Sequence, residues 1–311
     1  MPQTIRNPIE YMMDEVSELA HGVERAGQAM HRASTHMFTA PLRIQRITVA
    51  DLKDVLARGY RDFTAYRTDV VFLVLIYPLV SLVIAAAAFD AQLAPLLFPV
   101  ISGTAIMGPF VGVVLYEMSR RREISALRRH EEDHAWANAL GIVRSRNFGA
   151  IVMLGLMLVA LYVLWLGTAY GIYRALHGPQ PPETIGFFVR EVLQTPAGWW
   201  LIGLGCGIGF LFAALALMIG VVSFPLLLDR DVGLGTAIWT SVRAVAANPV
   251  PMAAWGLVVV IGLALGAVPL FVGLVVSMPV LCHATWHLYR KLLPRGPGLA
   301  RVQAGYDIRA F

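Results

Sequence analysis

The chain has 311 residues, of which 57% are hydrophobic and 14% charged, and its mean hydropathy is +0.64. Because soluble domains carry about 25% charged residues, this composition excludes an ordinary soluble protein and indicates an integral membrane protein. The net charge of +5 would also suit nucleic-acid binding. The basic residues instead follow the predicted membrane topology, so nucleic acid is not an expected partner.

The N-terminal segment lacks the basic and apolar regions of a cleaved signal peptide, so we expect residues 1–69 to lie in the cytoplasm. From Ile9 to Met30, apolar residues recur at alternating spacings of four and three, which predicts an amphipathic helix. Its other face is acidic and would be repelled by anionic lipid. We therefore expect residues 1–45 to form an arm that contacts another protein, a second copy or its own bundle. A marginal, largely mobile helix is the alternative.

Apolar stretches further along the chain predict transmembrane helices, because a bilayer core of about 30 Å needs about 20 apolar residues per helix. The last apolar run is too long for one span, and we divide it at Pro269, where Gly266 and Gly273 suit an outer turn. The six predicted spans are Val70–Ala88, Leu93–Tyr116, Phe148–Tyr173, Trp199–Phe224, Pro251–Val268 and Pro269–Leu288. A short interfacial helix is predicted over Ile185–Leu193. We thus predict an all-α polytopic membrane protein, with a six-helix membrane domain over 46–291 and a cytoplasmic basic tail over 292–311.

The distribution of Lys and Arg predicts the orientation of these spans. The segments that would face the cytoplasm hold 23 of the 25 basic residues, and the opposite side holds only Arg174 and Arg190. Cytoplasmic loops of membrane proteins carry such an excess. We expect a multi-pass protein of the bacterial inner membrane with both termini in the cytoplasm.

The spans are expected to form three hairpins, each preceded by a cytoplasmic amphipathic helix. The three leader segments are Val49–Tyr66, His134–Asn147 and Gly233–Asn248. In the first, Leu52, Val55, Leu56, Tyr60 and Phe63 follow helical spacing, whereas the charged residues lie elsewhere. Leader helices of this kind lie at the headgroup boundary or pack under the bundle.

Two histidines near the end of the last span are the sharpest chemical feature. His283 and His287 are four residues apart, so they share one helix face, and two imidazoles so spaced can chelate a transition metal or ligate haem. If the hairpins repeat, Glu117 lies at the depth of His287 and could supply a carboxylate. The alternative, which we favour, is that both histidines anchor the helix at the membrane interface beside Trp286 and Tyr289.

Two other motifs indicate structural roles. Asp229-Arg230-Asp231 follows the fourth span and is typical of a salt bridge at a helix end. Four glycines with GxxxG spacing predict faces that let another helix approach closely, and through them contacts with other membrane proteins. These glycines are Gly203 and Gly207 in the fourth span and Gly108 and Gly112 in the second.

No charged residue falls near the midplane of a predicted span, which argues against a proton-coupled pump. The sequence also contains no Walker A, HExxH or GxSxG motif. We therefore expect neither an enzyme nor a cofactor.

Several segments resemble a family of bacterial integral membrane proteins catalogued as domain of unknown function 2189. The resemblance extends from about Arg46 to Lys291 and is carried by ITVADLKDVLARGYRDF, GPFVGVVLYEMSRRRE, SFPLLLDRDVGLGTAIWTSVRAVAANP and HATWHLYRK. The family implies no established activity, although some members are loosely labelled cytochrome c oxidase subunit I. A haem–copper core requires many more spans and histidine ligands than this sequence contains. The label could still reflect association with an oxidase.

These features together predict a non-catalytic accessory, assembly or scaffold subunit of a larger membrane complex, such as a respiratory oxidase. The alternative is a transporter or channel for a small solute, lipid or metal, which requires a polar passage between the spans. A haem or metal protein using His283 and His287 is a third, weaker hypothesis.

Overall fold

The computed structural model describes residues 42–65, 94–128, 147–268 and 272–294, and the regular structure in these ranges is helical. In chain order the helices are α2 (Val49–Ala65), α5 (Ala94–Val111), α6 (Val113–Arg128), α8 (Phe148–His177), α9 (Ile185–Gln194), α10 (Pro196–Gly220), α11 (Ser223–Asp229), α12 (Leu234–Ala247), α13 (Pro249–Ala267) and α14 (Leu274–Leu292). The predicted helix of Ile9–Met30, the predicted span Val70–Ala88 and all but the last residue of the second leader lie outside the described residues. The division into arm, membrane domain and tail therefore stays a prediction.

Helices α5 and α6 form one almost continuous rod. Backbone hydrogen bonds of 2.9 Å continue through the junction, from Gly112 N to Gly108 O and from Tyr116 N to Gly112 O. The sequence predicts a span that ends at Tyr116, but the helix extends to Arg128. It continues because its polar residues pair with one another and with neighbouring helices.

The ends of the next helices have clear local causes. Gly178 follows α8 with φ of 80°, a left-handed conformation that glycine adopts without strain. The hydroxyl groups of Thr184 and Thr195 accept backbone hydrogen bonds and thereby cap α9 and α10. Helix α9 occupies the predicted short helix and ends one residue later, at Gln194.

Four stretches of the described residues are long and apolar enough to cross a membrane: Ala94–Ala126, Phe148–His177, Pro196–Asp229 and Pro249–Ala267. They correspond to the second to fifth predicted spans. Helix α14 overlaps the sixth but is not among the four, because its second half carries His283, His287, Arg290 and Lys291. Most of α14 is also buried by protein. The count of six spans and their arrangement as three hairpins stay predictions.

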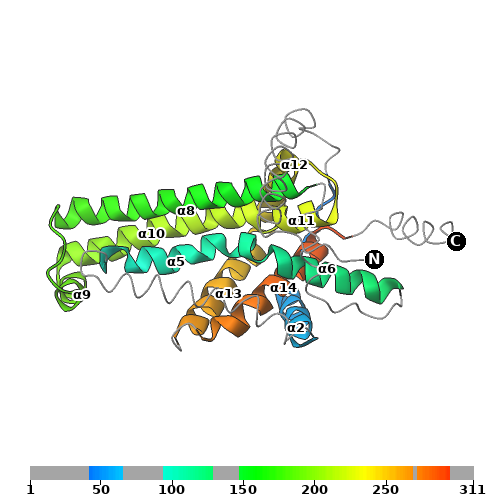
Figure 1. Cartoon of the computed structure of the whole chain (residues 1–311), viewed down its shortest axis with the longest axis horizontal. Coiled ribbons are helices and arrows are strands. Elements are labelled where there is room, and N and C mark those ends of the chain that lie inside the picture. The colour runs from blue at the N-terminus through cyan, green and yellow to red at the C-terminus, as the bar shows by residue number, and fades with distance from the viewer. Residues whose placement is uncertain (1–41, 66–93, 129–146, 269–271, 295–311) are drawn as a thin grey trace, which may run out of the picture.

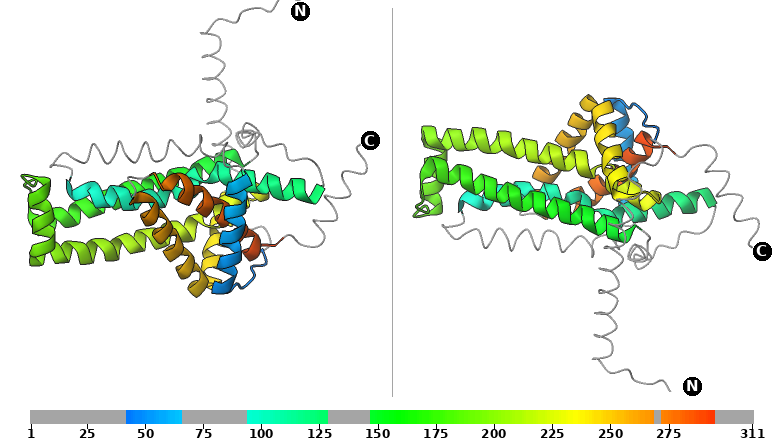
Figure 2. Two further views of the ribbon diagram at one scale, coloured as in Figure 1. Left: turned by 90° about the horizontal axis from the view of Figure 1, so that it is seen from below. Right: turned by 90° about the horizontal axis from the view of Figure 1, so that it is seen from above.

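Helices α5, α8 and α10 run side by side, whereas the α13–α14 hairpin crosses them at an angle (Figures 1 and 2). Helix α2 lies against α14, and α12 lies against α10 and α11. We call the region where α2, α6, α11, α12 and the C-terminal half of α14 gather the polar end. The parts of α8 and α10 that extend away from it, together with α9, form what we call the long arm.

The two regions are packed differently. The polar end buries large aromatic side chains completely, among them Trp286, Tyr289 and Phe224. In the long arm Trp165 of α8 packs on Phe212 of α10, with ring centroids 5.5 Å apart, and donates its Nε1 hydrogen to Pro99 O of α5 at 3.0 Å. Elsewhere this arm exposes apolar side chains such as Trp200 and Phe210, which suits a surface in lipid.

Candidate functional site

Asp62 of α2 is the centre of a buried polar cluster that joins three helices. Its Oδ2 atom accepts hydrogen bonds from Ser119 Oγ of α6 at 2.6 Å and from His287 Nε2 of α14 at 2.8 Å. Its Oδ1 atom lies 3.2 Å from Arg122 Nη1. Ser119 is also 2.8 Å from His283 Nδ1. We call these five residues the Asp62 cluster.

The hydrogen-bond geometry assigns protons within this cluster. The hydroxyl of Ser119 has a single proton, which it donates in a hydrogen bond to the carboxylate of Asp62. The remaining bond to Ser119 must then be donated by Nδ1–H of His283. His287 donates from Nε2, because an ionised carboxylate can only accept.

Burial alone would raise the pKa of Asp62, because it disfavours the charged form. The hydrogen bond and charge of His287, together with the Ser119 hydroxyl, outweigh that effect and hold the pKa below its ordinary value. Asp62 is therefore a carboxylate at neutral pH, although its side chain is only 9% exposed. A buried anion of this kind fixes the position of the groups that surround it.

The structure brings two of the three predicted metal-ligand candidates together and leaves the third elsewhere. His283 and His287 both belong to the Asp62 cluster. Glu117 instead pairs with Arg120 at 2.6 Å and Arg121 at 2.8 Å on its own helix. Asp62 supplies the carboxylate that we expected from Glu117. Within the described ranges, no group of three or more His, Cys, Asp and Glu side chains is arranged to hold a metal ion.

Our sequence analysis did not single out Asp62, but a signal for it exists. The buried face of α2 consists of Leu52, Val55, Gly59 and Asp62, at spacings of three or four residues, and Phe63, four residues after Gly59. Asp62 is thus a carboxylate within the apolar stripe of an amphipathic helix, where a charged side chain needs a partner. Tyr60, which we assigned to that stripe, is 56% exposed.

A second polar cluster lies beside the first and joins α6, α11 and α14. Arg290 donates to Glu123 Oε1 at 2.8 Å and to Asp229 Oδ2 at 3.0 Å. Tyr289 donates its hydroxyl to the same oxygen of Asp229 at 2.7 Å, and Trp286 donates Nε1 to Glu123 at 3.1 Å. We call these five residues the Asp229 cluster. Its contacts agree with the predicted salt-bridge role of Asp229.

Charge and burial act together in the Asp229 cluster. Burial raises the pKa of the Tyr289 hydroxyl, and the neighbouring charge of Asp229 raises it further. Tyr289 therefore stays neutral and donates its hydrogen bond at any physiological pH. The guanidinium of Arg290 also lies 5.8 Å from the ring centroid of Trp286, within the range of a cation–π contact.

Helix α2 contacts α14 through its backbone as well as its side chains. A Cβ atom at Gly59 would lie 2.6 Å from Ala284 N and 2.7 Å from Val280 O, so only glycine allows this approach. At the end of α14, Lys291 Nζ lies 2.8 Å from Asp51 and 3.1 Å from Asp54. The hydrogen bond from Lys291 lowers the pKa of Asp51, and hydrogen bonds from Arg58 and Lys291 lower the pKa of Asp54.

The predicted glycine faces differ in their surroundings. Gly112 packs against Cys282 of α14, whose sulfur would lie 2.7 Å from an added Cβ. Gly108, Gly203 and Gly207 have open space at the same position within the described part of the chain. Three of the four glycines are therefore not used for packing among the described helices.

The fold and its apolar helices define a multi-pass integral membrane protein, and within the described ranges its buried polar residues lie at one end. Residues 97–229, from α5 to α11, match the family described as "Predicted integral membrane protein (DUF2189)". This match confirms the resemblance to that family over residues 97–229, and the function of the family is unknown. No curated protein and no solved structure matches the chain.

Proposed function

We propose that the chain is a non-catalytic protein of the bacterial inner membrane that serves as an accessory or assembly subunit of a larger membrane complex. The observation that carries this proposal is that its chemically reactive side chains form contacts within the chain. His283, His287, Glu117 and Asp229 are each bonded to other side chains of the same chain. Side chains held in this way are well suited to fixing the positions of helices, which supports a structural role.

The long arm and the second span supply surfaces for the proposed partners. Gly203 and Gly207 of α10, and Gly108 of α5, have open space beside them in the described part of the chain. Small residues spaced by four allow a second transmembrane helix to approach closely. Exposed apolar side chains around them, such as Leu204 and Phe210, suit either lipid or a partner helix.

The distribution of charge supports an orientation with the polar end in the cytoplasm. The Asp62 and Asp229 clusters and their basic residues lie at the polar end, whereas Arg174 and Arg190 lie at the tip of the long arm. An excess of Arg and Lys on the cytoplasmic side is the general rule for membrane proteins.

The transport alternative has less support. It requires a polar passage between the spans, and the buried polar clusters described above lie at the polar end. Association with a respiratory oxidase rests on the loose labelling of some family members, and the match to residues 97–229 adds nothing to it.

Purification of the tagged full-length chain from its own membrane in a mild detergent, followed by native mass spectrometry, tests the proposal. We expect a stoichiometric complex with at least one other membrane protein. Replacing Gly203 and Gly207 together by leucine should reduce the amount of that partner at least severalfold, because the added side chains block close helix approach.

Gly186→Leu is a matched control, because Gly186 also has open space beside it but belongs to the short helix α9. It should leave the partner in place. A lone monomer from the native membrane, or equal recovery of the partner with the Gly203/Gly207 double variant and the wild type, contradicts the proposal in its present form.

A further inference from the structure

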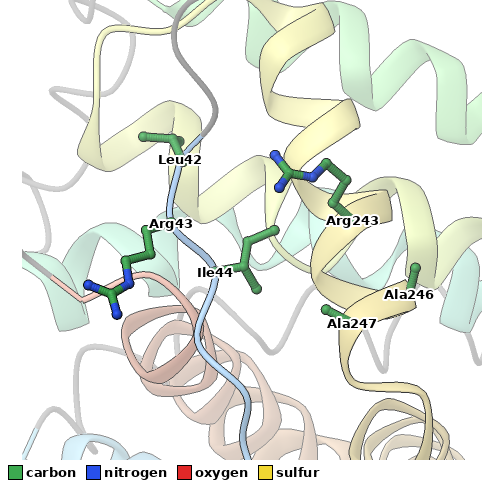
Figure 3. Close-up of a pocket in the computed structure, with 6 residues that line it drawn as sticks. All are labelled: Leu42, Arg43, Ile44, Arg243, Ala246 and Ala247. Carbon is green, nitrogen blue, oxygen red and sulfur yellow. The ribbon is translucent and has the colours of Figure 1, made fainter.

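A groove opens at the polar end between α12 and the extended segment that precedes α2 (Figure 3). Its volume is about 630 Å³. Leu42 and Ile44 provide apolar lining and also pack against the hydrophobic core. The other lining residues are Arg43, Arg243, Ala246 and Ala247. The groove thus combines an apolar floor, a small-residue wall and two positive charges.

Both arginines lack an ion-pair partner in the part of the chain that the structure describes, and no acidic residue lines the groove. Two other arginines of the polar end are paired, Arg122 with Asp62 and Arg290 with Asp229. Figure 3 shows Arg243 reaching from α12 toward the segment, whereas Arg43 leaves the segment on its other side. The two guanidinium groups therefore lie on opposite sides of the segment.

The walls of the groove are fixed by one buried asparagine. Asn248, at the junction of α12 and α13, accepts a hydrogen bond from Ile47 N at 2.8 Å and donates to Gln45 O at 3.2 Å. It also donates to Ala244 O within α12 at 3.0 Å. These bonds hold the segment beside α12, so the groove is formed without a ligand. Binding of a ligand therefore requires little loss of conformational entropy.

The groove lies close to the end of a membrane span. Helix α13, one of the four stretches able to cross a membrane, begins at Pro249, directly after Asn248. Trp239 on α12 is 57% exposed and Val250 is 68% exposed. Exposed tryptophan is typical of the headgroup region. A ligand in this groove would therefore meet both the headgroups and the edge of the hydrocarbon layer.

We propose that this groove binds an anionic phospholipid. Arg243 contacts the headgroup phosphate, for which a guanidinium group is well suited, and Arg43 adds positive charge on the other side of the segment. Leu42 and Ile44 contact the first methylene groups of the acyl chains. The small side chains of Ala246 and Ala247 leave the space that the headgroup occupies. This site is independent of any protein partner of the chain.

Native mass spectrometry of the full-length protein in a neutral detergent tests the proposal. Phosphatidylglycerol and phosphatidylcholine with identical acyl chains are titrated in parallel. We expect tighter binding of phosphatidylglycerol. Arg243→Gln should weaken that preference about fivefold, the usual contribution of one basic residue at an anionic surface. The Arg43→Gln/Arg243→Gln double variant should weaken it further.

Arg190→Gln, which removes an arginine from α9 at the tip of the long arm, is the matched control and should leave the preference unchanged. Since each variant is compared between two lipids, a general loss of stability affects both titrations equally. Equal binding of the two lipids by the wild type overturns the proposal. An unchanged preference for phosphatidylglycerol in the double variant also overturns it. The same holds if inorganic phosphate binds as tightly as phosphatidylglycerol.

Discussion

The polar end and the long arm hold their helices together by different means. At the polar end, buried ions and hydrogen bonds join helices that are distant in sequence, as in the contact of Asp62 with Ser119 and His287. In the long arm the contacts are aromatic and apolar, with isolated hydrogen bonds such as that from Trp165 to Pro99. The polar end therefore specifies which helices meet, whereas the helices of the long arm are held mainly by apolar packing.

This difference follows from the surroundings of each region. Apolar side chains gain little by leaving lipid for a protein interior, so contacts in a membrane depend on close packing and a few hydrogen bonds. Buried charges, by contrast, need defined partners, and removal of one partner leaves the other without compensation. Substitutions at the polar end should therefore have larger effects than those in the long arm.

Asp62→Ala is expected to have the largest effect. It leaves His287 and Arg122 without the carboxylate that they contact, at a site where Asp62 is 9% exposed and His287 16%. Removal of one member of a buried ion pair costs about 3–5 kcal/mol, and we expect about 3 kcal/mol here because Arg122 is partly exposed. Reversible unfolding in mixed detergent micelles measures the change.

The pH dependence of Asp62→Asn gives an independent check on this explanation. The folded pKa of Asp62 lies below its unfolded value of about 3.9. Its stabilisation is therefore complete above the unfolded pKa and is lost as the pH falls through the folded pKa. The stability difference between wild type and Asp62→Asn should persist from neutral pH to about pH 4 and shrink below it. A difference that does not change down to pH 2 would contradict a role for the carboxylate charge.

Gly59→Val should have the next largest effect. The added Cβ would overlap backbone atoms of Ala284 and Val280 on α14, and backbone atoms cannot move aside as a side chain can. Overpacking of this kind costs about 1–3 kcal/mol. We also expect α2 to become accessible to trypsin in detergent. Gly167→Val is the control, because Gly167 of α8 has open space around it, and it should leave digestion of α2 unchanged.

The fold was predictable where one residue pattern dominates. The apolar runs predict the spans beginning near Leu93, Phe148, Trp199 and Pro251 to within a few residues. Their ends are less predictable, since α6 continues past Tyr116 through ion pairs with residues far along the chain. Helix α14 is the main difference between the predicted spans and the structure. Its first half is apolar enough for a span, but its second half carries His283, His287, Arg290 and Lys291, and it packs against α2, α6 and α13.

Trp165→Phe tests the long arm and should have a smaller effect. It removes the hydrogen bond to Pro99 O but keeps an aromatic ring beside Phe212. Hydrogen bonds between transmembrane helices contribute about 0.6 kcal/mol on average, so we expect a loss of about 1 kcal/mol including the reduced packing area. The same unfolding assay measures it. A loss as large as that of Asp62→Ala would overturn the distinction between the two regions.

The candidate site was predictable only in part. Spacing alone places His283 and His287 on one face, and the structure joins both to a single cluster. The identity of the carboxylate was not predictable in that way. Glu117 was chosen by its register in a supposed repeat, whereas Asp62 reaches His287 because α2 packs on α14, a contact between the two ends of the chain. Such long-range pairings leave little trace in one sequence beyond a charge on an apolar face.

Arg58→Ala should have the smallest effect and defines the lower limit of the comparison. Arg58 and Asp54 lie on the solvent face of α2, four residues apart, with side chains 52% and 39% exposed. Exposed pairs at this spacing contribute about 0.3–0.5 kcal/mol and are screened by salt, so the loss should fall further in about 1 M salt. Lys291→Ala removes contacts with Asp51 and Asp54 that join α14 to α2, and it should cost more than Arg58→Ala. Equal losses of stability in the two variants would mean that a surface contact between helices contributes no more than one within a single helix. The stability of the polar end would then come from its buried clusters.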